Sequence, residues 1–163
     1  MKGGENMKYQ YKMVSVYVRE NQNLILVPKG LCFGRPGFGG SGGSDVDIGP
    51  VNELLYPYTD NDIEQALLDT MDKCFGESPT PEEMKLPGSL ADFMGVKSWK
   101  KATEKLKLFN FRWYKDDGYS LSPYKKEKRG DYSGTFESEI HLGHTLEEGK
   151  LAKAVREVLK IIE

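Results

Sequence analysis

The order in which the predicted strands and helices follow one another constrains the fold of this chain more than any other feature. Two strand-like segments, residues 9–18 and 24–28, come first, and further strand-like segments cluster between residues 109 and 143. Helical patterns occupy the region between these clusters and the end of the chain. Because the strands do not alternate with helices, this order favours an antiparallel sheet in an α+β fold over a parallel, doubly wound sheet.

We predict a single α+β domain over residues 1–163, with an antiparallel β-sheet of about five to six strands packed by about two to three helices. A length of 163 residues suits one such domain. Residues 1–7 are expected to be disordered, and residues 34–44 are expected to form a flexible glycine-rich loop.

The predicted strands show alternating apolar residues and end at turn-forming residues. The first strand has one slip in its alternation, which indicates a β-bulge. A turn at residues 21–23 joins it to the second strand, which Pro28 is expected to end. The sequence Asp-Asp-Gly at residues 116–118 predicts a second hairpin, and residues 135–143 predict a last strand.

The first predicted helix begins near residue 60. Asn61 and Glu64 form a capping-box pattern, and Thr59 or Asp60 offers an alternative start. Gly76 is expected to end this helix. Its apolar stripe at helical spacing consists of Ile63, Ala66, Leu67, Thr70, Met71 and Cys74.

Two further helical regions follow. Residues 89–109 are predicted to form one helix, or two short helices broken near Gly95. Ser98 would cap the second of these, from which Trp99 is expected to point inward. Residues 145–148, Thr-Leu-Glu-Glu, form a capping box that predicts the start of the final helix. The apolar stripe of that helix, which is expected to face the core, consists of Leu146, Leu151, Ala154, Val155, Val158, Leu159 and Ile162.

Lysines cluster between residues 97 and 107, and a second basic run occupies residues 125–129. On a helix over the first segment, Lys97, Lys101 and Lys105 would form one row at a spacing of four, opposite an apolar stripe. This pattern is typical of the solvated face of a packed helix. The alternative is a phosphate-binding surface made by both segments. A net charge of −2 and a pI of about 5.8 argue mildly against a dedicated nucleic-acid-binding protein.

Two motifs that can mark cofactor or metal sites are present without the context that such sites need. Residues 37–42 match G-x-G-x-x-G, but Pro36 precedes them and no helix follows. His141 and His144 have no third ligand close in the sequence, whereas zinc sites need three or four. We therefore predict a flexible loop, surface histidines, no cofactor and no bound metal.

Asp45 and Asp47 would lie on one face of an extended segment. Paired carboxylates can perform acid–base chemistry or hold a divalent cation, so a small hydrolase is one alternative function. Aspartates are equally common in turns, and the sequence shows no nucleophile elbow or Cys/His nucleophile pattern. The prediction is therefore that the chain is not an enzyme.

The remaining composition predicts a cytoplasmic protein. No run of about 18 apolar residues that could span a membrane is present. The first residues lack the apolar core of a signal peptide. Cys32 and Cys74 are too few for a disulfide framework, so both are expected to be reduced thiols.

Several short motifs after residue 50 resemble the immunity proteins of bacterial contact-dependent growth inhibition systems (CdiI). The matching positions are Lys97, Ser98, Trp99, Ser122, Pro123, Gly130, Gly134, Glu147, Glu148, Gly149, Ala154 and Leu159. The likeness covers residues 51–163, and Gln65 departs from a glycine that the family often has there. The resemblance implies a protein that binds the C-terminal toxin domain of a large surface protein, often a nuclease, and neutralises it in the cytoplasm.

Charge alone indicates which residues could contact such a toxin. A nuclease tends to have a basic active cleft, so an inhibitor gains speed and specificity from acidic groups. The candidate partner-binding residues are Asp45, Asp47, Asp60, Asp62, Glu77, Glu82 and Glu83. A membrane, a nucleic acid or a small-molecule substrate is not expected as a partner.

Overall fold

The structure is a computed structural model that describes residues 11–32, 44–47, 50–74, 90–134 and 138–162. For residues 30–32, 44–47 and 134 it describes the backbone alone. The helices and strands are β1 (Tyr11–Val18), β2 (Leu24–Cys32), β3 (Ser44–Asp47), β4 (Asn52–Leu54), α2 (Asp60–Met71), α4 (Leu90–Met94), α5 (Trp99–Ala102), β5 (Lys107–Tyr114), β6 (Gly118–Lys126), β7 (Tyr132–Gly134), β8 (Ile140–Gly143) and α6 (Lys150–Ile161). None of the helices within these ranges has the length and apolar character needed to cross a bilayer.

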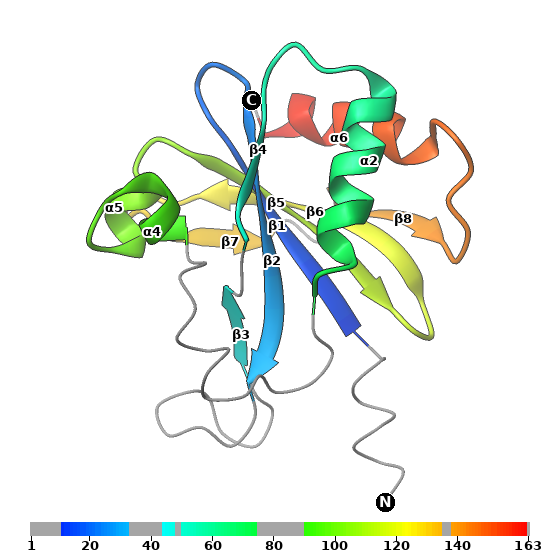
Figure 1. The fold of residues 1–163 in the computed structure, drawn as a ribbon, viewed down its shortest axis with the longest axis horizontal. Helices are drawn as coiled ribbons and strands as arrows, with labels where there is room; N and C mark the ends of the chain where they lie inside the picture. The colour runs from blue at the N-terminus through cyan, green and yellow to red at the C-terminus, as the bar shows by residue number, and fades with distance from the viewer. Residues whose placement is uncertain (1–10, 33–43, 48–49, 75–89, 135–137, 163) are drawn as a thin grey trace, which may run out of the picture.

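All the strands belong to one antiparallel sheet, which confirms the predicted α+β fold. Its main path runs β3-β2-β1-β5-β6-β7, with β4 paired to β2 and β8 paired to β6 (Figure 1). Within the described ranges the sheet has eight strands, more than predicted, because three short strands, β3, β4 and β7, come from segments between the predicted strands. Helices α2 and α6 lie together against the sheet, and α4 and α5 lie at its other side (Figure 1).

Strand β1 is buried on both of its faces. Val14 and Val16 enter the core beneath α2 and α6, whereas Tyr17 enters a second core with residues of α4 and α5. Ser15, also buried, donates a hydrogen bond of 2.8 Å from its hydroxyl to the side-chain oxygen of Asn110 on β5. The pairing of β1 with β5 runs without a slip from Tyr11 to Val18. The predicted bulge is therefore wrong: burial on both faces, not a bulge, disturbs the alternation.

Strand β2 continues past Pro28, contrary to the prediction. It pairs with β1 up to Pro28 and then with β3 over residues 29–32. The strand changes partners at the proline, which has no N–H to give to a ladder. The last residue of the predicted glycine-rich loop, Ser44, is the first residue of β3; residues 34–43 and residues 1–7 lie outside the described ranges.

Helix α2 begins at Asp60, and the alternative residue Thr59 is its N-cap. The hydroxyl of Thr59 accepts from the N–H of Asp62, and the Asp62 carboxylate accepts from the N–H of Thr59. The Asn61–Glu64 box is wrong, because Glu64 points to another helix. The predicted stripe is confirmed, with Ile63 and Leu67 among its buried members. The helix ends at Met71, before Gly76, which is not among the described residues.

Glu64 caps helix α6 from outside. Its carboxylate oxygens accept hydrogen bonds from the backbone N–H groups of Gly149 (3.1 Å) and Ala152 (3.0 Å). Gly149 has a φ of +86° and offers no side-chain cap. The predicted box at residues 145–148 is wrong, since α6 starts at Lys150 and a carboxylate from α2 binds its free N–H groups instead.

The helical region before β5 is broken at Gly95, as predicted, and Ser98 caps its second part. Helix α5 contains only four residues, so Lys105 and Lys107 follow it and are not part of a helical row. Ala102 is buried, but Trp99 is 42% exposed and does not point fully inward. The last predicted strand is shorter than expected, because β8 spans only Ile140–Gly143.

Replacing Glu64 with alanine should lower the free energy of unfolding by about 1–2 kcal/mol, because two N–H groups at the start of α6 lose their acceptor. Urea denaturation measures this loss. Glu64→Gln, which keeps one carbonyl oxygen, should lose less, and Gln65→Ala, on the exposed side of α2, should change stability by less than about 0.5 kcal/mol. Equal losses for Glu64→Ala and Gln65→Ala would contradict this role of Glu64.

Candidate functional site

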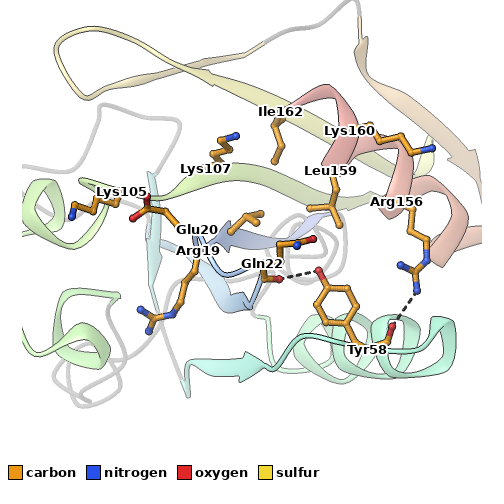
Figure 2. Close-up of a pocket in the computed structure, with 11 residues that line it drawn as sticks. Arg19, Glu20, Gln22, Tyr58, Lys105, Lys107, Arg156, Leu159, Lys160 and Ile162 are labelled. Carbon is orange, nitrogen blue, oxygen red and sulfur yellow. Dashed lines mark hydrogen bonds between the residues drawn. The ribbon is translucent and has the colours of Figure 1, made fainter.

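A hollow of about 750 Å³ lies near the end of α6, and we call it the main hollow. The β1–β2 turn, the segment after α5 and the last turn of α6 meet around it (Figure 2). Its lining residues are Val18, Arg19, Glu20, Gln22, Tyr58, Lys105, Lys107, Arg156, Leu159, Lys160 and Ile162. They come from four separate parts of the chain.

The main hollow has an apolar floor and one aromatic wall. Val18 is buried, and Leu159 and Ile162 are partly buried against the core beneath α6. Tyr58 forms the wall and donates from its hydroxyl to the backbone oxygen of Gln22, at 3.0 Å (Figure 2). Burial raises the pKa of Tyr58, so its hydroxyl remains a donor. The floor and wall are therefore held in place by the fold itself.

The rim of the main hollow is cationic. Arg19 is fixed by Glu53 (Nε to Oε2, 2.7 Å), and Arg156 is fixed by Asp60 (Nε to Oδ1, 2.8 Å). Figure 2 shows the lysine side chains of the rim reaching outward from its edge. Within the described ranges no ion pair engages any of these three lysines, which are Lys105, Lys107 and Lys160.

A second hollow, the lysine groove, brings together the two basic segments that the sequence suggested as a pair. Its volume is about 780 Å³, and its lining residues are Ser98, Lys100, Lys101, Glu104, Lys126, Glu127, Lys128, Arg129 and Gly130. The Lys126 ammonium donates to the backbone oxygens of Thr103 and Glu104, at the end of α5. The Tyr132 hydroxyl donates to the backbone oxygen of Leu106 at 2.7 Å. These bonds hold residues 125–129 beside residues 97–107.

Burial affects the ionisable groups of this contact in opposite ways. It raises the pKa of Tyr132, because a phenolate would be poorly solvated there, and it lowers the pKa of Lys126. The Lys126 ammonium also lies 5.5 Å from the centroid of the Tyr132 ring, which is an attractive cation–π arrangement.

A smaller hollow of about 340 Å³, the connecting hollow, links the other two. It shares Lys107 and Ile162 with the main hollow and Lys126 with the lysine groove. Eleven lysines and arginines but only three glutamates line the three hollows, so this cationic band has a formal charge of +8 in a chain of −2. Three of the cations pair with carboxylates outside the lining, at Glu53, Asp60 and Asp131. The rest of the chain is correspondingly acidic.

The structure does not gather the predicted acidic residues at one place. Asp60 and Asp62 lie at the exposed start of α2, where one pairs with Arg156 and the other closes the capping box. Asp45 and Asp47 lie on β3, at the opposite end of the view in Figure 1, and pair with residues 29–31 of β2. The other three, Glu77, Glu82 and Glu83, fall outside the described ranges.

The remaining sequence candidates are accounted for as follows. His141 and His144 are exposed, and no group of three or more metal-binding side chains occurs in the part of the chain that the structure describes. Cys74 is buried, and its thiol donates a hydrogen bond of 3.1 Å to the backbone oxygen of Met13. The motif at residues 37–42 lies outside the described ranges.

Sequence reasoning missed the main hollow. Arg19, Tyr58 and Arg156 are far apart in the chain, and nothing in their spacing indicates a shared site. Leu159 and Ile162 belong to the helical stripe that was expected to be core. One signal of an exposed apolar surface was available in the sequence, because two adjacent apolar residues, Ile161 and Ile162, end the stripe. In the structure Ile161 is 49% exposed.

Replacing Tyr132 with phenylalanine should lower the free energy of unfolding by about 1–2 kcal/mol at neutral pH, through loss of its hydrogen bonds. The folded-state pKa of Tyr132 lies above its ordinary value of 10.0. The stability that the protonated phenol contributes is therefore present below pH 10 and is lost as the pH rises above it. Urea unfolding above pH 10 should accordingly show a shallower decline in stability for Tyr132→Phe than for the wild type.

Tyr56→Phe is the matched control, because Tyr56 is 50% exposed. Its alkaline decline should follow the wild type. Identical declines for the wild type and Tyr132→Phe would show that the buried phenol does not contribute.

Comparison with known proteins identifies a solved structure with a similar fold, but no relative of known function. No protein-family model matches the chain, and no curated protein matches it. The solved structure of NMB0488 from Neisseria meningitidis, described as a protein of unknown function, is similar with a TM-score of 0.67. The similarity covers 96% of this chain and 98% of that one at 11% sequence identity. The chain therefore shares its fold with this neisserial protein over nearly the whole length of both.

Proposed function

We propose that this chain is an immunity protein that binds a cognate contact-dependent growth inhibition toxin domain, such as a nuclease, and neutralises it in the cytoplasm. It acts by binding and not by catalysis. The likeness of residues 51–163 to that family is the basis of the proposal. One structural observation supports it most: Ser98, Pro123 and Gly130, from three separate matching segments, all line hollows of the cationic band.

A rigid surface suits such a role. Binding loses less free energy when the contacting side chains are already ordered. In the cationic band Arg19 and Arg156 are held by carboxylates, and Lys126 by backbone oxygens at the end of α5. A surface prepared in this way can bind an acidic surface of a toxin domain without rearrangement.

Co-expression with the toxin domain encoded immediately upstream of the gene should restore growth of cells that the toxin alone arrests. The two proteins should also elute together in gel filtration, because neutralisation requires a lasting complex. A variant unfolded by a buried charge, Phe109→Asp, is the control and should not protect. Arrested growth with wild-type chain present, and separate elution, would contradict the proposal.

A nucleic-acid-binding regulator is the second candidate, and the lysine groove favours it. This groove joins residues 97–107 and 125–129, the two basic segments that such a function would use. The resulting surface would track a phosphate backbone without reading base sequence.

The second candidate predicts that a mixed-sequence RNA or DNA fragment binds with an affinity that falls steeply as salt rises. The double variant Lys128→Glu/Arg129→Glu should then lose binding and reduce the salt slope by about 2. Lys73→Glu/Lys153→Glu, which makes the same change in charge at exposed positions outside the band, should keep the slope. Fluorescence anisotropy over a salt series measures both, and the same slope in both double variants would exclude the lysine groove.

A further inference from the structure

We infer that the main hollow is the docking site for an acidic segment of the toxin domain, with one apolar side chain of that segment seated on the hollow's floor. This inference rests on the proposed function and names the face of the chain that performs it. It differs from the expectation from charge alone, in which acidic residues of this chain make the contact.

The floor provides the first argument. Val18, Leu159 and Ile162 present aliphatic surface at the bottom of a hollow of about 750 Å³. Leu159 and Ile162 pack against the core from its edge, so their outer surfaces remain open to water. An apolar side chain inserted from a partner would remove the exposed surfaces of Leu159 and Ile162, and its own surface, from water. This burial is favourable by roughly 25 cal/mol per Å² of apolar area. The floor is thus complementary to an apolar anchor.

The charge of the rim provides the second argument. Lys105, Lys107 and Lys160 surround the floor and make no ion pair within the described ranges, and the single acidic lining residue is Glu20. A cationic rim around an apolar centre is complementary to a segment that carries acidic residues beside an apolar one. The rim would speed and orient association, and the floor would slow dissociation.

Exposed apolar residues flank the hollow on two sides. Tyr56 is 50% exposed and meets the wall residue Tyr58 edge to face, with ring centroids 5.5 Å apart. Ile161 is 49% exposed and lies in the connecting hollow together with Ile162. These exposed aromatic and aliphatic residues enlarge the apolar surface beyond the floor of the hollow, and a protein partner can cover this larger surface.

The same features favour a protein over a nucleic acid at this hollow. Single-stranded nucleic acids bind by stacking bases on aromatic faces, but the floor here is aliphatic. Tyr58 is only 8% exposed, and its ring is already contacted by the ring of Tyr56.

The charge of the rim is tested with Lys107→Glu/Lys160→Glu and the upstream-encoded toxin domain. Association, followed by surface plasmon resonance, should be about tenfold slower than for the wild type at low ionic strength, and the difference should shrink at high salt. The control is Lys73→Glu/Lys153→Glu, which makes the same change in net charge at exposed positions that line none of the three hollows. The control should associate much faster than the rim variant.

The floor is tested by dissociation rates. Ile162→Ala should release the toxin domain about tenfold faster, and Ile161→Ala, at an exposed site that cannot disturb the core, several-fold faster. Phe93→Ala removes a similarly exposed apolar side chain, 39% exposed, from α4 and should dissociate like the wild type. A thermal melt tests whether Ile162→Ala is folded. If this variant is unfolded, the dissociation rate of Ile161→Ala alone tests the contribution of the floor.

The outcomes separate this inference from the proposed function. Wild-type binding and growth protection, with rim and control variants equally fast and Ile161→Ala unchanged, would overturn the docking site and leave immunity intact. No binding and no protection by the wild type would overturn both. Binding of an RNA fragment that Lys107→Glu/Lys160→Glu abolishes, without toxin binding, would overturn the choice of a protein as the occupant.

Discussion

The burial of β1 and β5 on both faces is the constraint on which the rest of the structure depends. Val14 and Phe111 pack beneath α2 and α6, while Tyr17 and Leu108 pack toward α4 and α5. Because both faces of the central sheet are covered, a partner cannot bind there. The open surfaces lie instead where strand ends, turns and helix ends meet, and the main hollow forms at one such place, between the β1–β2 turn and the end of α6 (Figure 2).

The cationic band exists because specific contacts oppose the mutual repulsion of its lysines. Like charges brought together raise the free energy of the folded chain. The Lys126 ammonium offsets part of this cost by donating to the backbone oxygens of Thr103 and Glu104, directly after α5. Lys105, Lys107 and Lys160 form no ion pair within the described ranges, so an anionic partner could pair with them without displacing a carboxylate of this chain.

Glu64 shows most clearly how far local sequence patterns reach. Its position three residues after Asn61 matches a capping box, yet Thr59 and Asp62 form the box that α2 uses. Glu64 caps α6 instead, at a distance of 85 residues in the sequence from Gly149. The pattern correctly indicated that a helix starts there. It could not indicate which helix the carboxylate serves, because two helix starts within reach of one side chain compete through tertiary packing.

Local sequence patterns were enough to predict the α+β class, the hairpin at residues 116–118, the break at Gly95 and the stripe of α2, because each depends on neighbouring residues and on local periodicity. Packing between distant segments set the features that these patterns could not predict: α5 stops after four residues, β2 continues past Pro28, and the two basic segments share one groove. It also decided that residues from four parts of the chain form the main hollow. Contacts between distant segments set these features, and their energies leave no periodic pattern in the sequence.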